Sequence, residues 1–145
     1  MALIDLKFYS EVLKMGTEVH VIIPQKNAIG EIGVTQNVLS GNYPCLYLLH
    51  GLGGDYSSWI RRTSIERYAE KYGICVVMPS ALRSFYTDMK NGLPYYTYVS
   101  QELPALIRSF FNISTECKDT FIAGLSMGGY GALKVGLTHP EQYGT

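Results

Sequence analysis

The pattern of hydrophobic and polar positions differs between the first part of the chain and the rest. Apolar and polar residues alternate in residues 4–8 and again in residues 19–23, before Pro24. A period of two is typical of half-buried antiparallel strands, so these segments predict a hairpin. Residues 25–44 are rich in Gly and Asn and predict a loop, in which a short further strand at Ile32–Val34 is left open.

Beyond this loop, three apolar runs are continuous rather than alternating. They comprise residues 45–49, 74–78 and 120–123. Continuous runs of this length are typical of strands that are buried on both faces, as in a parallel sheet.

Helical patterns lie between and after these runs. Residues 63–72 precede Gly73, a favourable C-cap, and residues 127–138 stop before a proline. Residues 98–111 share one apolar stripe. Pro104 is out of place there, because a proline inside a helix costs about 3 kcal/mol. It must lie near a first turn or begin a later helix.

The order of these elements predicts the architecture. Strands that alternate with helices form parallel pairs joined by crossovers. We therefore expect an α/β sheet with helices on both faces, preceded by the antiparallel hairpin. With no internal repeat and no low-complexity linker, residues 1–145 form part of a single domain.

Composition supports a folded chain and argues against several partners. Hydrophobic residues make up 47% of the 145 residues and charged residues 17%, which supplies enough apolar surface for a core. Twelve basic and twelve acidic residues give no net charge, so the positive field that nucleic-acid binding needs is missing. The apolar runs are far shorter than the roughly 18 residues of a membrane span.

The N-terminus and the cysteines bear on location. Residues 1–12 mix charged with apolar positions and lack the pattern of a signal peptide, which predicts a cytoplasmic protein. Cys45, Cys75 and Cys117 are an odd number at wide spacing, and two of them lie in strand-like runs. We interpret them as reduced and structural.

The clearest chemical signal is the pattern Gly-x-Ser-x-Gly, which runs from Gly124 to Gly128 around Ser126. Between a strand and a helix this pattern forms a sharp turn that exposes the serine, and side chains in place of its glycines would collide with the strand or helix. The alternatives are a closely packed glycine turn and a phosphate-binding loop. The sequence does not match the Walker pattern or the dinucleotide fingerprint.

Backbone amides near this turn are suited to stabilise a negative oxygen. The amide of Met127 lies at the start of a helix, where amides lack acceptors and the helix dipole is positive. A second amide is expected from the loop His50-Gly51-Leu52-Gly53-Gly54, which follows the strand at residues 45–49. We expect His50 to brace this loop by hydrogen bonds rather than to act as a base.

These motifs together resemble the α/β-hydrolase esterases grouped with esterase D, S-formylglutathione hydrolase and the mycolyltransferases, and especially the bacterial tributyrin esterases. The likeness extends over essentially the whole chain. It consists of YLLHG at 47–51, SW at 58–59, VVMP at 76–79, YTD at 86–88, YYT at 95–97, ELP at 102–104 and FIAGLSMGGYG at 121–131.

The resemblance implies a role for several residues. Ser126 would be the nucleophile, and the amides of Leu52 and Met127 would form the oxyanion hole. Trp59 and Tyr86 would border the acyl or alcohol pocket, with ordinary aromatic packing as the alternative. No cofactor and no metal site are expected, because no paired ligands stand at metal-binding spacing.

The residues that would activate the serine are missing. In this fold the catalytic acid and the histidine follow the nucleophile, and His139 is the one histidine that does so. The predicted helix after Ser126 would place His139 about 18 to 20 Å away. His20 belongs to the hairpin, and Asp88 is expected to order its own loop. We therefore expect an α/β-hydrolase domain truncated after this helix, with the triad Asp and His outside the chain.

Three functions follow from these expectations. The first is a serine carboxylesterase that hydrolyses short-chain esters of the tributyrin type or acetylated carbohydrates through an acyl-enzyme, with the fragment alone inactive. The second is an S-formylglutathione hydrolase, which is a thioesterase. The third is a non-catalytic fragment that assembles with a complementary chain or a second copy through the free edge of its sheet.

Overall fold

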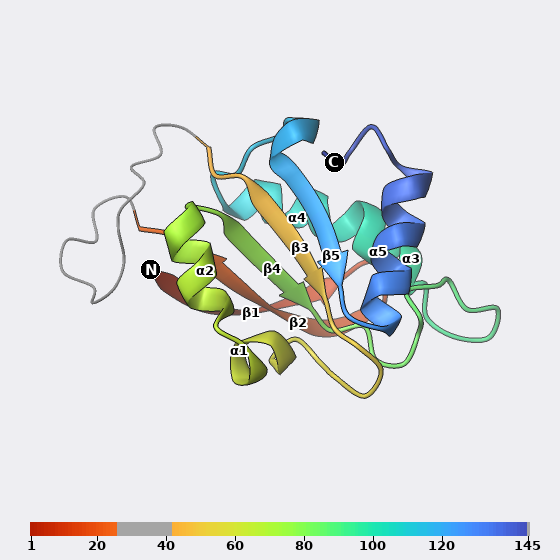
Figure 1. Ribbon diagram of the computed structural model, residues 1–145. Helices are drawn as coiled ribbons and strands as arrows, with labels where there is room; N and C mark the ends of the chain where they lie inside the picture. Colours follow the sequence, from red (N-terminus) through yellow and green to blue (C-terminus); the bar gives the residue numbers. More distant parts are fainter. Residues whose placement is uncertain (26–41, 145) are drawn as a thin grey trace.

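The computed structural model describes residues 1–25 and 42–144, so the strand considered at Ile32–Val34 lies outside the described residues. Within them, five strands form one mixed sheet in the order β1-β2-β4-β3-β5 (Figure 1). Strands β1 (Ala2–Ser10) and β2 (Met15–Ile23) form the predicted antiparallel hairpin. Alternation of apolar and polar residues identified this hairpin because one side of β1 remains partly open to solvent.

The central strands come from the continuous apolar runs. β3 (Cys45–Leu49) is parallel to both β4 (Cys75–Pro79) and β5 (Thr120–Gly124), and β2 joins β4 antiparallel. Every residue of β4 is buried, as predicted for a strand covered on both faces. For β5 the expectation was wrong, because Ala123 is exposed. This strand forms the edge of the described sheet and has no neighbour on one side.

Helices cover both faces of the sheet, as predicted (Figure 1). One face carries α1 (Ser58–Arg62), a short helix that the sequence did not indicate, and α2 (Ile65–Tyr72). Gly73 ends α2 with a left-handed φ of 64°. The opposite face carries α5 (Met127–Thr138), whose predicted bounds are confirmed.

A bent helix accompanies α5 on that face. It consists of α3 (Tyr95–Thr97), a π-helical turn (Tyr98–Glu102) and α4 (Leu103–Phe110). The amide of Leu103 donates to the carbonyl of Tyr98, five residues back. This change in hydrogen-bonding register lets the helix pass Pro104, which has no N–H to donate. Pro104 is the second residue of α4, so it lies in the first turn of a helix that begins later than residue 98, as the sequence predicted.

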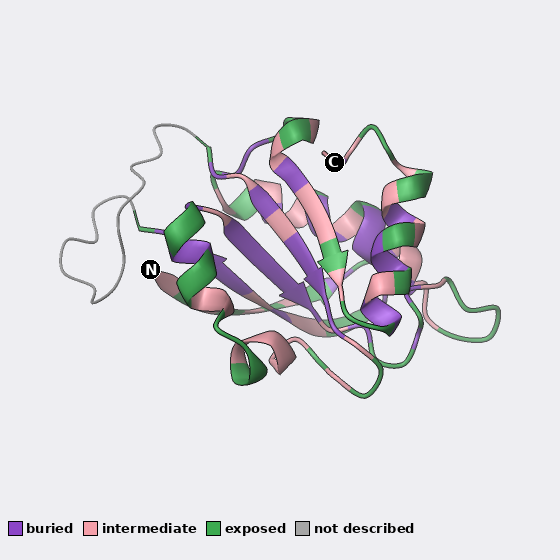
Figure 2. Cartoon of the chain, in the orientation of Figure 1, coloured by how far each residue is buried: buried purple, intermediate pink, exposed green. Residues whose placement is uncertain are grey.

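Buried residues lie mainly on the central strands and on the helices that cover the two faces of the sheet (Figure 2), and they form one core cluster on each face. Cys45 and Cys75 lie in this interior as register partners on β3 and β4, and all three cysteines are free. A hydrogen bond with Cys45, as the larger cause, and burial raise the pKa of the Cys75 thiol far above its usual value. Both thiols are therefore unreactive parts of the core.

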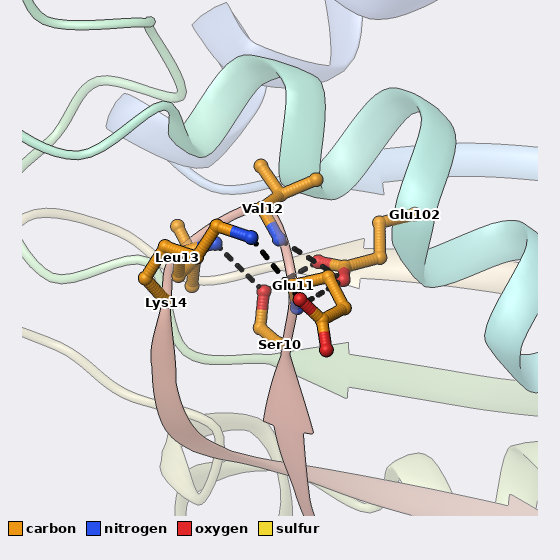
Figure 3. A network of polar contacts seen from close by, with 6 residues as sticks. All are labelled: Ser10, Glu11, Val12, Leu13, Lys14 and Glu102. Atoms are coloured by element: carbon orange, nitrogen blue, oxygen red, sulfur yellow. Dashed lines mark hydrogen bonds and ion pairs between the residues drawn. The ribbon is translucent and has the colours of Figure 1, made fainter.

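Glu102 ties the helical layer to the end of the hairpin (Figure 3). Its carboxylate accepts hydrogen bonds from the amides of Glu11 and Val12, at 2.6 and 3.2 Å, and from the hydroxyl of Ser10. The amide of Leu13 donates in turn to the Ser10 oxygen at 2.9 Å. One carboxylate thus satisfies the turn between β1 and β2.

Candidate active site

Ser126 stands at the corner between β5 and α5. Its backbone angles are φ 55° and ψ −114°, a conformation that residues with a side chain rarely adopt. The residue is exposed. The predicted strand, sharp turn and helix are therefore present, and the strain presents the side chain at the surface.

The two glycines of the motif allow this corner to form. A Cβ atom on Gly124 would lie 2.4 Å from the carbonyl carbon of Gly128, and one on Gly128 would lie 2.3 Å from the carbonyl oxygen of Leu49. Contacts this short are against backbone, which cannot give way. The start of α5 thus packs directly on the ends of β5 and β3, as the spacing of the glycines indicated.

The loop after β3 lies against the same corner. A Cβ atom on Gly51 would be 3.2 Å from the carbonyl oxygen of Leu125 and 3.7 Å from Cβ of Ser126. The loop closes with a hydrogen bond from the Gly54 amide to the Gly51 carbonyl at 3.0 Å, and Gly53 has a positive φ of 77°. Two loops that lie about 75 residues apart in the sequence therefore meet at Ser126.

The amides predicted for the oxyanion hole belong to this junction. Met127 is the first residue of α5, so its N–H has no acceptor within the helix. Leu52 lies in the turn after Gly51, and its amide has no acceptor among the described residues. The role of these two amides as an oxyanion hole stays a prediction.

His50 braces this loop, as expected. Its ring is buried, Nδ1 lies 2.8 Å from the carbonyl oxygen of Gly51, and Nε2 accepts a hydrogen bond from the Ala81 amide at 2.9 Å. These partners require a neutral ring with its proton on Nδ1. Burial lowers the pKa of His50, although the bond to Gly51 acts in the opposite direction. With both nitrogens occupied, His50 has no lone pair to offer Ser126.

The two aromatic residues suggested for the pocket occupy different environments. Trp59 donates from Nε1 to the carbonyl of Leu49 at 3.2 Å. It also lines a hollow of about 160 Å³ bounded by the glycine loop and Leu125. Tyr86 is fully buried, and its hydroxyl donates to the carbonyl of His50 at 2.9 Å. For Tyr86 the packing alternative describes the structure, because the hydrogen bond holds its ring inside the core.

Two exposed aromatic residues near Ser126 were missed. Phe85 is 47% exposed and Tyr130 is 51% exposed, and their rings pack edge to face with centroids 6.2 Å apart. The amide of Tyr130 donates to the carbonyl of Ser126 at 3.0 Å, which places it one helical turn further on. Because residues four apart lie on the same face of a helix, the position of Tyr130 four residues after Ser126 was the signal that could have indicated its place near the serine.

None of the three histidines of the sequence is placed to activate Ser126. His139 ends α5 at the far side, with Nδ1 at 3.4 Å from a carboxylate oxygen of Glu141. His20 on β2 packs edge to face against Tyr56, with centroids 4.5 Å apart. Asp88 orders its own loop, as expected, by accepting bonds from the amide and hydroxyl of Thr97 at 2.9 and 2.6 Å.

Other classes of site have little support in the described parts of the chain. No group of three or more His, Cys, Asp or Glu side chains there could hold a metal ion. In the same residues, no helix combines the length and the apolar character that crossing a bilayer requires.

Comparison with known proteins places this geometry among hydrolases. The Esterase family model, described as "Putative esterase", matches residues 34–145. An acetyl esterase of Caldicellulosiruptor saccharolyticus is 37% identical over 144 residues, which are 99% of this chain and 53% of that protein.

Solved structures give the same result. The fluorophosphonate-binding serine hydrolase FphF of Staphylococcus aureus superposes with a TM-score of 0.87 at 36% identity, over 98% of this chain and 54% of the other. The S-formylglutathione hydrolase FrmB of Staphylococcus aureus superposes with a TM-score of 0.82, also at 36% identity and over the same shares. The expected α/β-hydrolase type of fold is confirmed, and the chain spans about half the length of these relatives.

Proposed function

The chain belongs to the Esterase family, and from this premise we propose that it carries the nucleophile and the oxyanion hole of a serine carboxylesterase. The observation that supports this most directly is the exposed Ser126 at a strained corner, with the glycine loop of Gly51 packed against it. Such strain persists at functional sites because the surrounding structure fixes it.

The proposed reaction has two steps. The Ser126 hydroxyl gives its proton to a base and its oxygen bonds to the ester carbonyl carbon, while the carbonyl oxygen becomes negative. The amides of Leu52 and Met127 donate to that oxygen. The intermediate collapses, the bond to the alcohol breaks, and the alcohol leaves with the proton. Water then attacks the acyl-serine in the same way, which releases the acid and restores the hydroxyl.

We propose that the base and its acidic partner lie outside these 145 residues. Residues 1–145 would be the N-terminal part of one hydrolase domain, and the triad Asp and His would follow. Two observations support this division: the three histidines are engaged elsewhere, and the relatives are about twice as long. By itself the chain is expected to be inactive.

The edge of β5 is the proposed junction with the rest of that domain. A groove of about 550 Å³ runs between β5 and α5. It is lined by apolar residues that include Leu133 and Leu137, which are 66% and 78% exposed. A further strand paired with β5 would cover these side chains and satisfy the open edge. A complementary chain or a second copy of this chain could supply that strand instead.

We propose short-chain acyl esters as the substrates, of the tributyrin type or on acetylated carbohydrates. The small hollow beside Trp59 and Leu125 supports a short acyl group. The acetyl esterase relative supports the same class. A thioesterase that acts on S-formylglutathione is the second candidate, favoured by the likeness to FrmB. A cytoplasmic location remains a prediction.

Covalent labelling tests the central proposal. The full-length protein that contains this chain is treated with a fluorophosphonate and mapped by mass spectrometry. We expect one adduct at Ser126, none in Ser126→Ala, and unchanged labelling in Ser109→Ala, which changes an exposed serine of α4. An unlabelled protein, or an adduct at another serine, would contradict the assignment.

Turnover separates the candidate functions. The esterase proposal predicts a higher kcat/KM for p-nitrophenyl acetate than for S-formylglutathione, and the thioesterase alternative predicts the reverse.

A mixing experiment tests the assembly alternative. The 145-residue chain is mixed with a polypeptide that carries the remaining strands. A complex that forms and hydrolyses esters supports the enzyme, whereas an inactive complex with native spectra supports a scaffold.

A further inference from the structure

Ser126 lies between two different surfaces. On the side of α1 is the small hollow lined by the glycine loop, Trp59 and Leu125, together with the polar residues Ser58, Arg62 and Thr63. On the side of α5 are the exposed rings of Phe85 and Tyr130. We call these two rings the aromatic wall. Tyr130 follows the serine by one turn of α5, and side chains on a helix lean toward its N-terminus, so the side chain of Tyr130 is directed toward the end of α5 at which Ser126 stands.

The loop that carries Phe85 is held in a strained conformation. Leu82, Phe85 and Tyr86 have positive φ angles of 49°, 52° and 52°. Left-handed backbone at such residues is unfavourable and persists only where other contacts enforce it. Leu82 and Phe85 nevertheless expose their apolar side chains, so burial of those side chains does not explain the conformation.

Contacts at both ends enforce this loop. At its start the amide of Ala81 donates to His50, and at its end the hydroxyl of Tyr86 donates to the His50 carbonyl. The ring of Tyr86 also fills the space over Gly131, where a Cβ atom would lie 2.4 Å from Cδ2. His50 thus holds both ends of this loop next to the glycine loop of the site.

A third contact ties the loop to α5. The ammonium of Lys134 donates to the hydroxyl of Thr87 at 2.8 Å and lies 5.9 Å from the centre of the Tyr130 ring. Phe85 therefore lies in the chain between two anchored residues, Ala81 and Tyr86, and its exposed ring packs against Tyr130. An exposed apolar pair held this firmly is suited to contact a ligand.

We infer that the aromatic wall of Phe85 and Tyr130 binds the alcohol portion of the ester and favours flat, apolar alcohols, while the hollow on the opposite side of Ser126 receives the acyl group. This inference rests on the proposed function and specifies its substrate class. The hollow of about 160 Å³ accommodates a short acyl chain. A ring on the alcohol side would stack against the exposed edges of the wall.

The test compares phenyl acetate with ethyl acetate in the full-length protein. The ratio of their kcat/KM values is measured for the parent, Phe85→Asn and Tyr130→Ala. Asn suits position 85 because it tolerates positive φ better than other residues with side chains. Tyr68→Ala, which removes an exposed aromatic ring on α2, is the matched control. We expect the ratio to fall by about fivefold in both wall variants and to stay unchanged in the control.

A second pair of substrates checks which side of the ester the wall contacts. Ethyl phenylacetate and ethyl acetate differ in the acyl group, and their ratio should be the same in all four proteins. Two results would overturn the inference while leaving the esterase proposal intact. One is that the kcat/KM ratio of phenyl acetate to ethyl acetate does not change in the wall variants. The other is that the ratio of ethyl phenylacetate to ethyl acetate falls instead. Absence of turnover together with absence of fluorophosphonate labelling would instead reject the proposed function.

Discussion

Nε2 of His50 accepts a hydrogen bond from the backbone amide of Ala81 at 2.9 Å, which joins the end of β3 to the end of β4 beside the serine. The bond requires that this nitrogen carry no proton. Because the ring is buried and both nitrogens are engaged, protonation would break a contact that positions the glycine loop. His50 is therefore a positioning residue that is sensitive to pH.

We predict a pH-dependent stability that originates at His50. Burial lowers the folded-state pKa of His50 below the usual value of 6.5, so below pH 6.5 the unfolded chain binds more protons than the folded one. The stabilisation is complete above that value and is lost as the pH falls from 6.5 toward the folded pKa. Urea unfolding at about pH 7.5 and about pH 5 should show lower stability at the acidic value.

His50→Asn should remove most of that difference between the two pH values, because no proton can then be taken up at this position. His139→Asn is the control, since His139 lies at the far end of α5 and should leave the difference in place. Equal pH dependence in the parent and in His50→Asn would contradict the prediction.

The strain at Ser126 predicts an unusual order of stability. Glycine adopts a φ of 55° without strain, whereas alanine does not. We expect Ser126→Gly to be about 1 kcal/mol more stable than Ser126→Ala, although neither protein can form an acyl-serine. At Ala105, an exposed position of α4, the order should reverse, with Ala105→Gly about 1 kcal/mol less stable than the parent. Thermal unfolding of both pairs measures the difference.

The two adjacent glycines of α5 predict opposite effects. A methyl group on Gly128 would overlap the carbonyl oxygens of Leu49 and His50, whereas one on Gly129 would lie 3.4 Å from its nearest neighbour. Gly128→Ala should destabilise the protein by about 3 kcal/mol and abolish labelling of the serine. Gly129→Ala should be neutral or stabilising by up to about 1 kcal/mol, because alanine favours a helix. Chemical denaturation measures the free energy of unfolding of each variant. Equal values for the two variants would contradict this prediction.

Glu102 is predicted to stabilise the hairpin. Replacing the carboxylate by an amide in Glu102→Gln removes charge-assisted bonds to Ser10 and to the amides of the turn. A loss of about 2 kcal/mol is expected, together with faster amide exchange at Glu11 and Val12. Glu116→Gln, which changes an exposed carboxylate, should leave both measurements unchanged. Slow exchange preserved in Glu102→Gln would show that the turn holds without the carboxylate.

Local patterns in the sequence were enough for the hairpin, the central strands and α5. They were also enough for the exposed corner at Ser126, since Gly124 and Gly128 stand where any side chain would collide. These features depend on residues that are close together in the chain, so the spacing of those residues is enough to predict them. The bent helix at Pro104 was harder, because a π-helical turn has no simple periodic signature.

The tertiary structure alone decided which side chains surround the serine. Tyr86 and Phe85 are neighbours of similar character, yet one is buried under Gly131 and the other faces Tyr130. The direction of each depends on contacts with His50 and with α5, which are distant in the chain. The amino-acid order thus determined the exposed serine corner and its helix, whereas the surfaces around that corner arise from packing between segments that only the folded chain brings together.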